Sequence, residues 1–154
     1  MSKAVHRTLL VTVDQPEGSV RALDWTLKHI YRPGDTILFL HILPAAQGGS
    51  SFLASDPQHD ELLNENLRCA IEEHLGQRAE ALGARAEVSI AKGEGGDADS
   101  IGDIICRKAQ EVEAALVVMA AHSKGSSVQH AVGAVTRHCT RHCTSTVLVM
   151  QQTA

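Results

Sequence analysis

The segment RHCTRHCTST, residues 137–146, holds two histidines and two cysteines within six positions, and both residue types bind metal ions. His138 and His142 are four residues apart, as are Cys139 and Cys143, so each pair lies on one side of a helix. The two pairs are rotated by about 100° from each other. A structural zinc site needs four converging ligands, and a neighbouring subunit would have to supply those that one helix cannot. We therefore expect no metal ion at this segment.

The alternative for the same segment is a helix that covers a sheet. Ala131, Val135 and Cys139 follow helical spacing, and Cys143 or His142 continues the row. A free cysteine behaves as a small apolar residue. The pattern therefore predicts that the cysteines contribute to a core.

Two short loops are the other candidates for chemistry. The segment AAHSKGSS, residues 120–127, follows an apolar run and precedes an expected helix. Its small residues allow backbone N–H groups to point at an anion, the helix N-terminus favours negative charge, and Lys124 adds a positive charge. The second loop is DQPEGS, residues 14–19. Both segments can also be surface loops without a ligand.

The common phosphate motifs are missing from the chain. Neither G-x-G-x-x-G at the first loop nor G-x-x-x-x-G-K-[ST] anywhere is present. This excludes an ordinary dinucleotide-binding domain and a P-loop NTPase.

Alternating strands and helices must position these loops. Short apolar runs predict strands at residues 7–13, 36–43, 84–92, 114–121 and 146–150. Amphipathic segments predict helices at 21–31 and 128–143, a helix ending near Gly83, and one that begins at Asp97 or Ser100. The helix ending near Gly83 is predicted to place one apolar row on the sheet: Leu63, Leu67, Ala70, Ile71, Leu75, Ala79 and Leu82.

This order of elements predicts an α/β fold, an open five-stranded parallel sheet with helices on both faces. Nearly continuous apolar strands agree with a sheet that is covered on both sides. Such sheets bind ligands beyond the carboxyl ends of their strands, where the strand order reverses. The candidate site is therefore expected at 14–19 and 122–127, with Asp14 buried at the end of the first strand and His41 at the core or rim of the sheet.

The composition limits the class of protein. The chain has 154 residues, which predicts one domain over 1–154, and 44% are hydrophobic, as in a globular protein. A net charge of -4 and an aromatic content of 3% disfavour nucleic-acid binding. No apolar run reaches membrane-spanning length, and no secretory signal is recognised, so we expect a cytoplasmic protein. The four cysteines do not suggest a disulfide framework.

A series of segments resembles one known family. They are VTVDQPEGSVRALDW at the start, LHI at 40–42, GD at 96–97, VVMAAHSKG, and VGAVTRHC leading into TVLVM. Together they resemble the universal stress protein family from about Val5 to Met150. The resemblance implies a Rossmann-like sheet in order 3-2-1-4-5, adenine-nucleotide binding in one branch of the family, and homodimers paired through the last strand.

The nucleotide-binding branch carries G-x-x-G, nine residues, and then G-[ST]. The matching positions here are Ala120, Ser123, Gly133 and Ala134, so only Gly133 agrees. A methyl group at Ala120 crowds the approach of ribose or phosphate. Ser123 adopts a left-handed backbone less readily than glycine does. Ala134 lacks a hydroxyl whose hydrogen bond to a charged oxygen would contribute about 1–3 kcal/mol.

The resemblance also implies which residues would bind the nucleotide. Asp14 would contact the base, Ile42 would line the adenine side, and residues 123–134 would contact the phosphates. The full predicted set is Val13, Asp14, Gln15, Ile42, Ala120, His122, Ser123, Lys124, Gly125, Gly133, Ala134 and Val135. The expected ligand is ATP or AMP, bound weakly, with magnesium possible alongside ATP.

Three functions follow from this resemblance. The first is a nucleotide-binding regulatory module in the stress response, and the second is a dimeric interaction protein that has lost the nucleotide. The third, a slow ATPase, is less favoured because no base, metal carboxylates or phosphate-binding arginine are evident. No catalytic residues or metal ligands are predicted. An uncovered apolar edge strand is a liability unless it pairs, so we expect a homodimer through Val147 to Met150.

Overall fold

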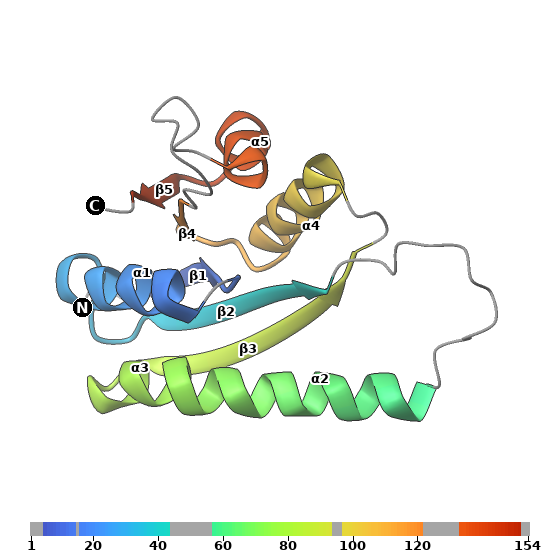
Figure 1. The fold of residues 1–154 in the computed structure, drawn as a ribbon. Coiled ribbons are helices and arrows are strands. Elements are labelled where there is room, and N and C mark those ends of the chain that lie inside the picture. The colour runs from blue at the N-terminus through green and yellow to red at the C-terminus, as the bar shows by residue number, and fades with distance from the viewer. Residues whose placement is uncertain (1–4, 15, 44–56, 94–96, 122–132, 152–154) are drawn as a thin grey trace.

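Five parallel strands form one open sheet in the computed structural model, which describes residues 5–14, 16–43, 57–93, 97–121 and 133–151 (Figure 1). The strands are β1 (Thr8–Thr12), β2 (Thr36–Leu43), β3 (Arg85–Lys92), β4 (Leu116–Ala120) and β5 (Val147–Met150). Their order is β3-β2-β1-β4-β5, and each neighbouring pair is parallel. The predicted fold class and strand order are confirmed.

The helical segments are α1 (Pro16–His29), α2 (Pro57–Ile71), the π-helical segment η1 (Glu72–Gly76), α3 (Gln77–Ala81), α4 (Ala98–Glu111) and α5 (Ala134–His142). The helix α1 begins earlier than the predicted residue 21. Much of the expected turn at 14–19 is its first turn, because proline is well suited to the first position of a helix. Of the two predicted caps, Asp97 and Ser100, Asp97 caps α4 by accepting a hydrogen bond from the Ser100 backbone N–H.

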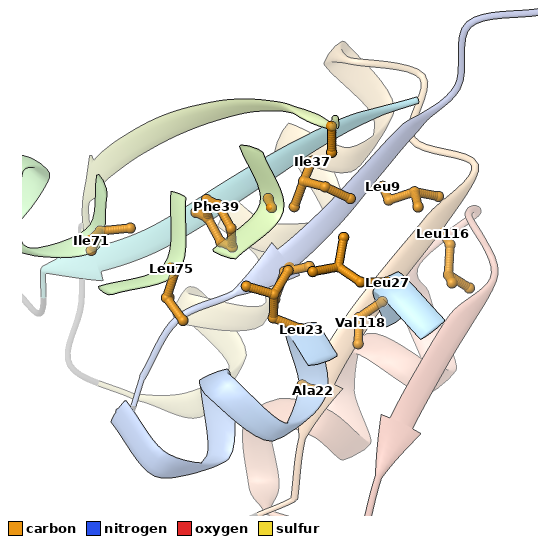
Figure 2. Packing of buried hydrophobic residues seen from close by; sticks show 13 residues of the cluster. Leu9, Ala22, Leu23, Leu27, Ile37, Phe39, Ile71, Leu75, Leu116 and Val118 are labelled. Atoms are coloured by element: carbon orange, nitrogen blue, oxygen red, sulfur yellow. The ribbon is translucent and has the colours of Figure 1, made fainter. Parts of the chain in front are cut away.

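The two faces of the sheet carry separate apolar cores because successive strand residues point to opposite sides. On one face, Leu9, Phe39 and Val118 of the strands pack against Leu23 of α1 and Leu75 of η1 (Figure 2). Leu10 and its neighbours pack against α4 and α5 on the other face. Figure 1 shows α1, α2 and α3 on one side of the sheet and α4 and α5 on the other.

The predicted apolar row of the second helix is only partly correct. Ile71, Leu75 and Ala79 are buried on the sheet, but Leu63 and Leu82 are 45% and 59% exposed. Ala70 is also exposed, and Leu67 is half-buried. Figure 1 shows α2 extending beyond the ends of β2 and β3, and Leu82 follows the end of α3, so Leu63 and Leu82 lie outside the stretch of helix that covers the sheet.

An ion pair between the half-buried Arg7 and the buried Asp35 ties the start of β1 to the turn before β2. Arg7 Nε donates to Asp35 Oδ1 at 3.0 Å, and Arg7 Nη2 donates both to Asp35 Oδ2 and to the carbonyl of Ile30. The Arg32 backbone N–H donates to Asp35 Oδ2 at 2.9 Å. Burial alone would raise the pKa of Asp35, but the hydrogen bonds from Arg7 and Arg32 outweigh it, and the pKa is lowered. Asp35 is therefore a charged residue held in place by its donors.

Candidate functional site

The strand order reverses at β1, which pairs with β2 on one side and β4 on the other. Parallel open sheets bind ligands in the crevice beyond such a point, at the carboxyl ends of the strands. The residues after β1 and β4 therefore define the candidate site. Val13 and Asp14 follow β1, Ala120 ends β4, and Gly133 precedes α5.

Hydrogen bonds fix the backbone at the end of β1. The Val13 N–H donates to the Leu40 carbonyl at 2.8 Å. His41 Nδ1 lies 2.7 Å from the Val13 carbonyl. Since a carbonyl only accepts, Nδ1 carries the hydrogen in this contact. His41 is half-buried, and its place at the rim of the sheet agrees with the prediction.

Asp14 is exposed, so the expectation that it is buried was wrong. The reason is that β1 ends at Thr12, and the chain has left the sheet when it reaches the carboxylate. A carboxylate at this position can accept hydrogen bonds from a ligand.

The methyl group of Ala120 lies between the end of β4 and the first turn of α1. A Cβ added at Gly18 would lie 3.1 Å from the Ala120 Cβ, so α1 approaches β4 closely here. Ala120 also packs against the core on the α1 side. A glycine at 120 would remove this methyl and leave more room beside α1.

The start of α5 presents backbone groups without a capping side chain. Gly133 is the N-cap residue, in extended backbone, and a Cβ added there would meet nothing within 4 Å. Ala134 is exposed, whereas Val135 packs into the core beside α4. A helix N-terminus of this kind favours an anion. Ile42 packs on the same core as Val135.

Several predicted site residues lie outside the described residues. They are Gln15, His122, Ser123, Lys124 and Gly125. Ala131 of the predicted apolar row lies outside them as well. The structure brings Val13, Asp14 and Ala120 to one edge of the sheet, and it places Gly133 and Ala134 at the helix that follows β4.

The histidine and cysteine segment forms most of α5 and packs on α4. His138 Nδ1 is 3.1 Å from Asp99 Oδ1, and its Nε2 is 2.7 Å from Asp103 Oδ1. Both ring nitrogens donate at once only in the imidazolium form. The ring lies directly over Gly102, since a Cβ added there would be 2.4 Å from His138 Cδ2. His142 is exposed and stacks beside His138 with ring centroids 4.3 Å apart.

Two of the four cysteines are paired, although their number and spacing did not suggest a disulfide framework. Cys106 on α4 and Cys143 at the end of α5 form a disulfide. Cys139 is free and fully buried, as the apolar reading of this segment predicted. Burial, with a smaller contribution from Asp103, raises the pKa of Cys139 to about 11. The spacing of residues 137–146 could not show that a neighbouring helix supplies a third cysteine.

A signal for this contact is present in the sequence of α4. Asp99, Gly102, Asp103 and Cys106 recur at helical steps and form one stripe. This stripe contacts His138, Cys139 and Cys143 of α5. The sequence of either helix alone does not predict the contact, because it does not show that α4 and α5 lie side by side.

The arrangement of sheet and helices is that of an open α/β protein whose strand order reverses at β1. The chain belongs to the Universal stress protein family, whose model matches residues 6–151. No curated protein sequence gives a significant match.

Solved structures share the fold at low sequence identity. The hypothetical protein MJ0577 aligns with a TM-score of 0.70 and 17% identity, covering 98% of this chain and 99% of its own. A universal stress protein family protein from Arabidopsis thaliana with AMP bound gives a TM-score of 0.63 and 20% identity, over 96% and 93% of the two chains. A universal stress protein in complex with cAMP gives 0.63 and 20%, over 94% and 96%.

Within the part of the chain that the structure describes, no helix is long and apolar enough to cross a membrane. The cytoplasmic location stays a prediction.

Proposed function

We propose that this protein is a regulatory module of the stress response, one domain over residues 1–154, that binds an adenine nucleotide weakly. The observation that carries the proposal is the reversal of strand order at β1, with the start of α1 close to Ala120 at the end of β4 and α5 following β4. The nucleotide's phosphates would lie at the N-terminus of α5 and its base near Asp14. The AMP and cAMP of the two structural neighbours support this choice of ligand.

The proposed ligand is ATP or AMP, and magnesium would accompany ATP. Asp14 is exposed at the end of β1, where it would face the base, and the start of α5 has no capping side chain, so its amides would face a phosphate. The predicted contacts from Gln15, His122, Ser123, Lys124 and Gly125 belong to the same proposal. Ile42 and Val135 pack into the core, so we assign them to the wall of the site.

One observation favours a second function. The Ala120 methyl fills the approach between β4 and α1, where the family motif has glycine. A chain that has lost the nucleotide in this way would act as a dimeric interaction protein. Both functions share a homodimer, which we propose to pair through β5.

Calorimetric titration separates the two functions. AMP, cAMP and ATP with magnesium are added in turn to the wild-type protein, to Asp14→Ala and to Ala120→Gly. We expect weak binding by the wild type, weaker binding by Asp14→Ala, and tighter binding by Ala120→Gly because the methyl is removed. Glu80→Ala is the matched control, because Glu80 is an exposed carboxylate on α3, ahead of β3 and outside the candidate site, and is expected to leave binding unchanged.

Each outcome decides between the proposals. No heat from any nucleotide up to millimolar concentration, in wild type and Ala120→Gly alike, would overturn nucleotide binding. Binding by Ala120→Gly alone would show that the fold keeps the site and that the methyl closes it, which supports the interaction protein.

A further inference from the structure

Three sulfur atoms meet where α4 packs on α5. The Sγ atoms of Cys106, Cys139 and Cys143 all lie within 4.8 Å of one another. Cys106 and Cys143 share a disulfide, while the Cys139 thiol is free and lies 3.8 Å from the Gly102 carbonyl. Nothing in the proposed nucleotide site uses this cluster.

The helix packing holds the three side chains together. Gly102 lets α5 approach α4 closely, and the His138 ring bridges Asp99 and Asp103 across the same contact. Cys139 is buried in the core of this face, whereas Cys106 and Cys143 are half-buried at its edge. The cluster thus has one closed side and one side that solvent reaches.

The distances suit a metal ion once the disulfide is reduced. Zinc–thiolate bonds are about 2.3 Å long, so three sulfurs around one ion are separated by about 3.8 Å. The present upper limit of 4.8 Å between sulfurs is close to that value. Sulfur donors select thiophilic d10 cations, of which Zn²⁺ and Cu⁺ are the common ones in proteins.

We propose that the reduced forms of Cys106, Cys139 and Cys143 bind one thiophilic d10 cation, and that the Cys106–Cys143 disulfide excludes it. A trigonal site needs only these three sulfurs, and a tetrahedral site takes a water molecule at the half-buried edge. The proposed ligands are two cysteines of residues 137–146 and one cysteine of α4, and neither His138 nor His142 is among them.

A dithiol reductant can convert the Cys106–Cys143 disulfide into two thiols. The dithiol forms its own disulfide, and its two electrons and two protons pass to the sulfurs of Cys106 and Cys143. The three thiols then lose three protons when the cation binds them. Oxidation by a disulfide reverses the first step and releases the ion.

The test uses the full chain with Cys69→Ser, because Cys69 is an exposed thiol outside the cluster. The protein is reduced with a phosphine, which takes up the oxygen of one water molecule as two thiols form. Zn²⁺ and Cu⁺ are each titrated against a competing chromophoric chelator, and Co²⁺ reports thiolate ligation through its charge-transfer absorption. We expect one ion per chain in the reduced protein and none in the oxidised protein.

Variants test the ligand set. Cys106→Ser and Cys139→Ala are expected to weaken binding by roughly tenfold or more, because each removes one of three thiolates. His142→Ala is the matched control from the same segment, where binding should be unchanged. Cys106 is half-buried, so its variant keeps the core intact and serves if Cys139→Ala fails to fold.

The outcomes show which of the two ions binds and whether the proposed site exists. Binding of Zn²⁺ alone, of Cu⁺ alone, or of both, with loss in the Cys106→Ser variant, supports the site. Failure of the reduced protein to bind either ion would overturn it. Equal binding by the oxidised protein, or by Cys106→Ser, would also overturn it.

Discussion

Gly102 is the residue that permits the contact between α4 and α5. A Cβ there would lie 2.4 Å from His138 Cδ2 and 3.0 Å from its Cβ, so the whole ring has to move. We expect Gly102→Ala to destabilise the fold by about 1–3 kcal/mol through overpacking. Urea unfolding measures the effect. Gly133→Ala is the control, since its added Cβ meets nothing and its φ of -61° suits alanine; equal stability of Gly102→Ala and the wild type would contradict this packing.

Cys139 and Cys69 differ in the reactivity of their thiols. Cys139 is fully buried and has its pKa raised to about 11, whereas Cys69 is exposed. At pH 8 only about one Cys139 in a thousand is a thiolate, because the pH is three units below the pKa. We expect iodoacetamide to modify Cys69 while Cys139 stays intact, as measured by peptide mass spectrometry under native, non-reducing conditions. Similar rates at both residues would show that α5 opens readily.

At the scale of elements, the Arg7–Asp35 pair fixes β1 beside β2. Asp35 is 3% exposed, so Asp35→Asn leaves Arg7 with a weaker partner and should lower the free energy of unfolding by about 2–4 kcal/mol at pH 7. Asp24→Asn is the control because the Asp24–Arg78 pair is exposed, and it should have little effect.

The same pair predicts a pH dependence. The pKa of Asp35 is lowered in the folded state, so the unfolded chain takes up a proton first as the pH falls. The stability that the charged carboxylate contributes is fully present above its unfolded pKa, about 3.9, and is lost as the pH drops through the folded value. Urea unfolding between pH 7 and pH 3 should show a smaller decline in Asp35→Asn than in the wild type. Parallel declines would assign the acid sensitivity to other carboxylates.

Most strands were predictable because they are apolar runs between polar turns, and β2 has the predicted bounds of 36–43, whereas β3, with the sequence RAEVSIAK, gave a weaker signal. The strand order came from the family resemblance, since alternation alone does not say on which side of β1 each strand lies. The exposed leucines of α2 were not predictable, because helical periodicity does not show where the sheet ends. The Cys106–Cys143 bond depends on two helices meeting, which no local pattern records.

At the scale of the whole molecule, β5 is an edge strand with half-exposed residues throughout. We expect the protein to be a dimer at micromolar concentration, because an apolar edge of this kind pairs with another strand. Val149→Lys should convert it to a monomer, as measured by light scattering. Val5→Lys is the control, because Val5 is 81% exposed and lies before β1. A monomeric wild type would rule out the β5 pairing.

The disulfide has a consequence for how the molecule opens. It closes a covalent ring between positions 37 residues apart, which contains β4 and α5. In the chain-entropy treatment a ring of this size restricts the unfolded state by about 3.8 kcal/mol. Local unfolding of the segment from β4 to α5 is therefore expected to cost more free energy while the bond is intact. Once the bond is cut, amide hydrogens of α5 should exchange with solvent faster than those of β2. The redox state of the two cysteines would therefore set how often the segment from β4 to α5 unfolds locally.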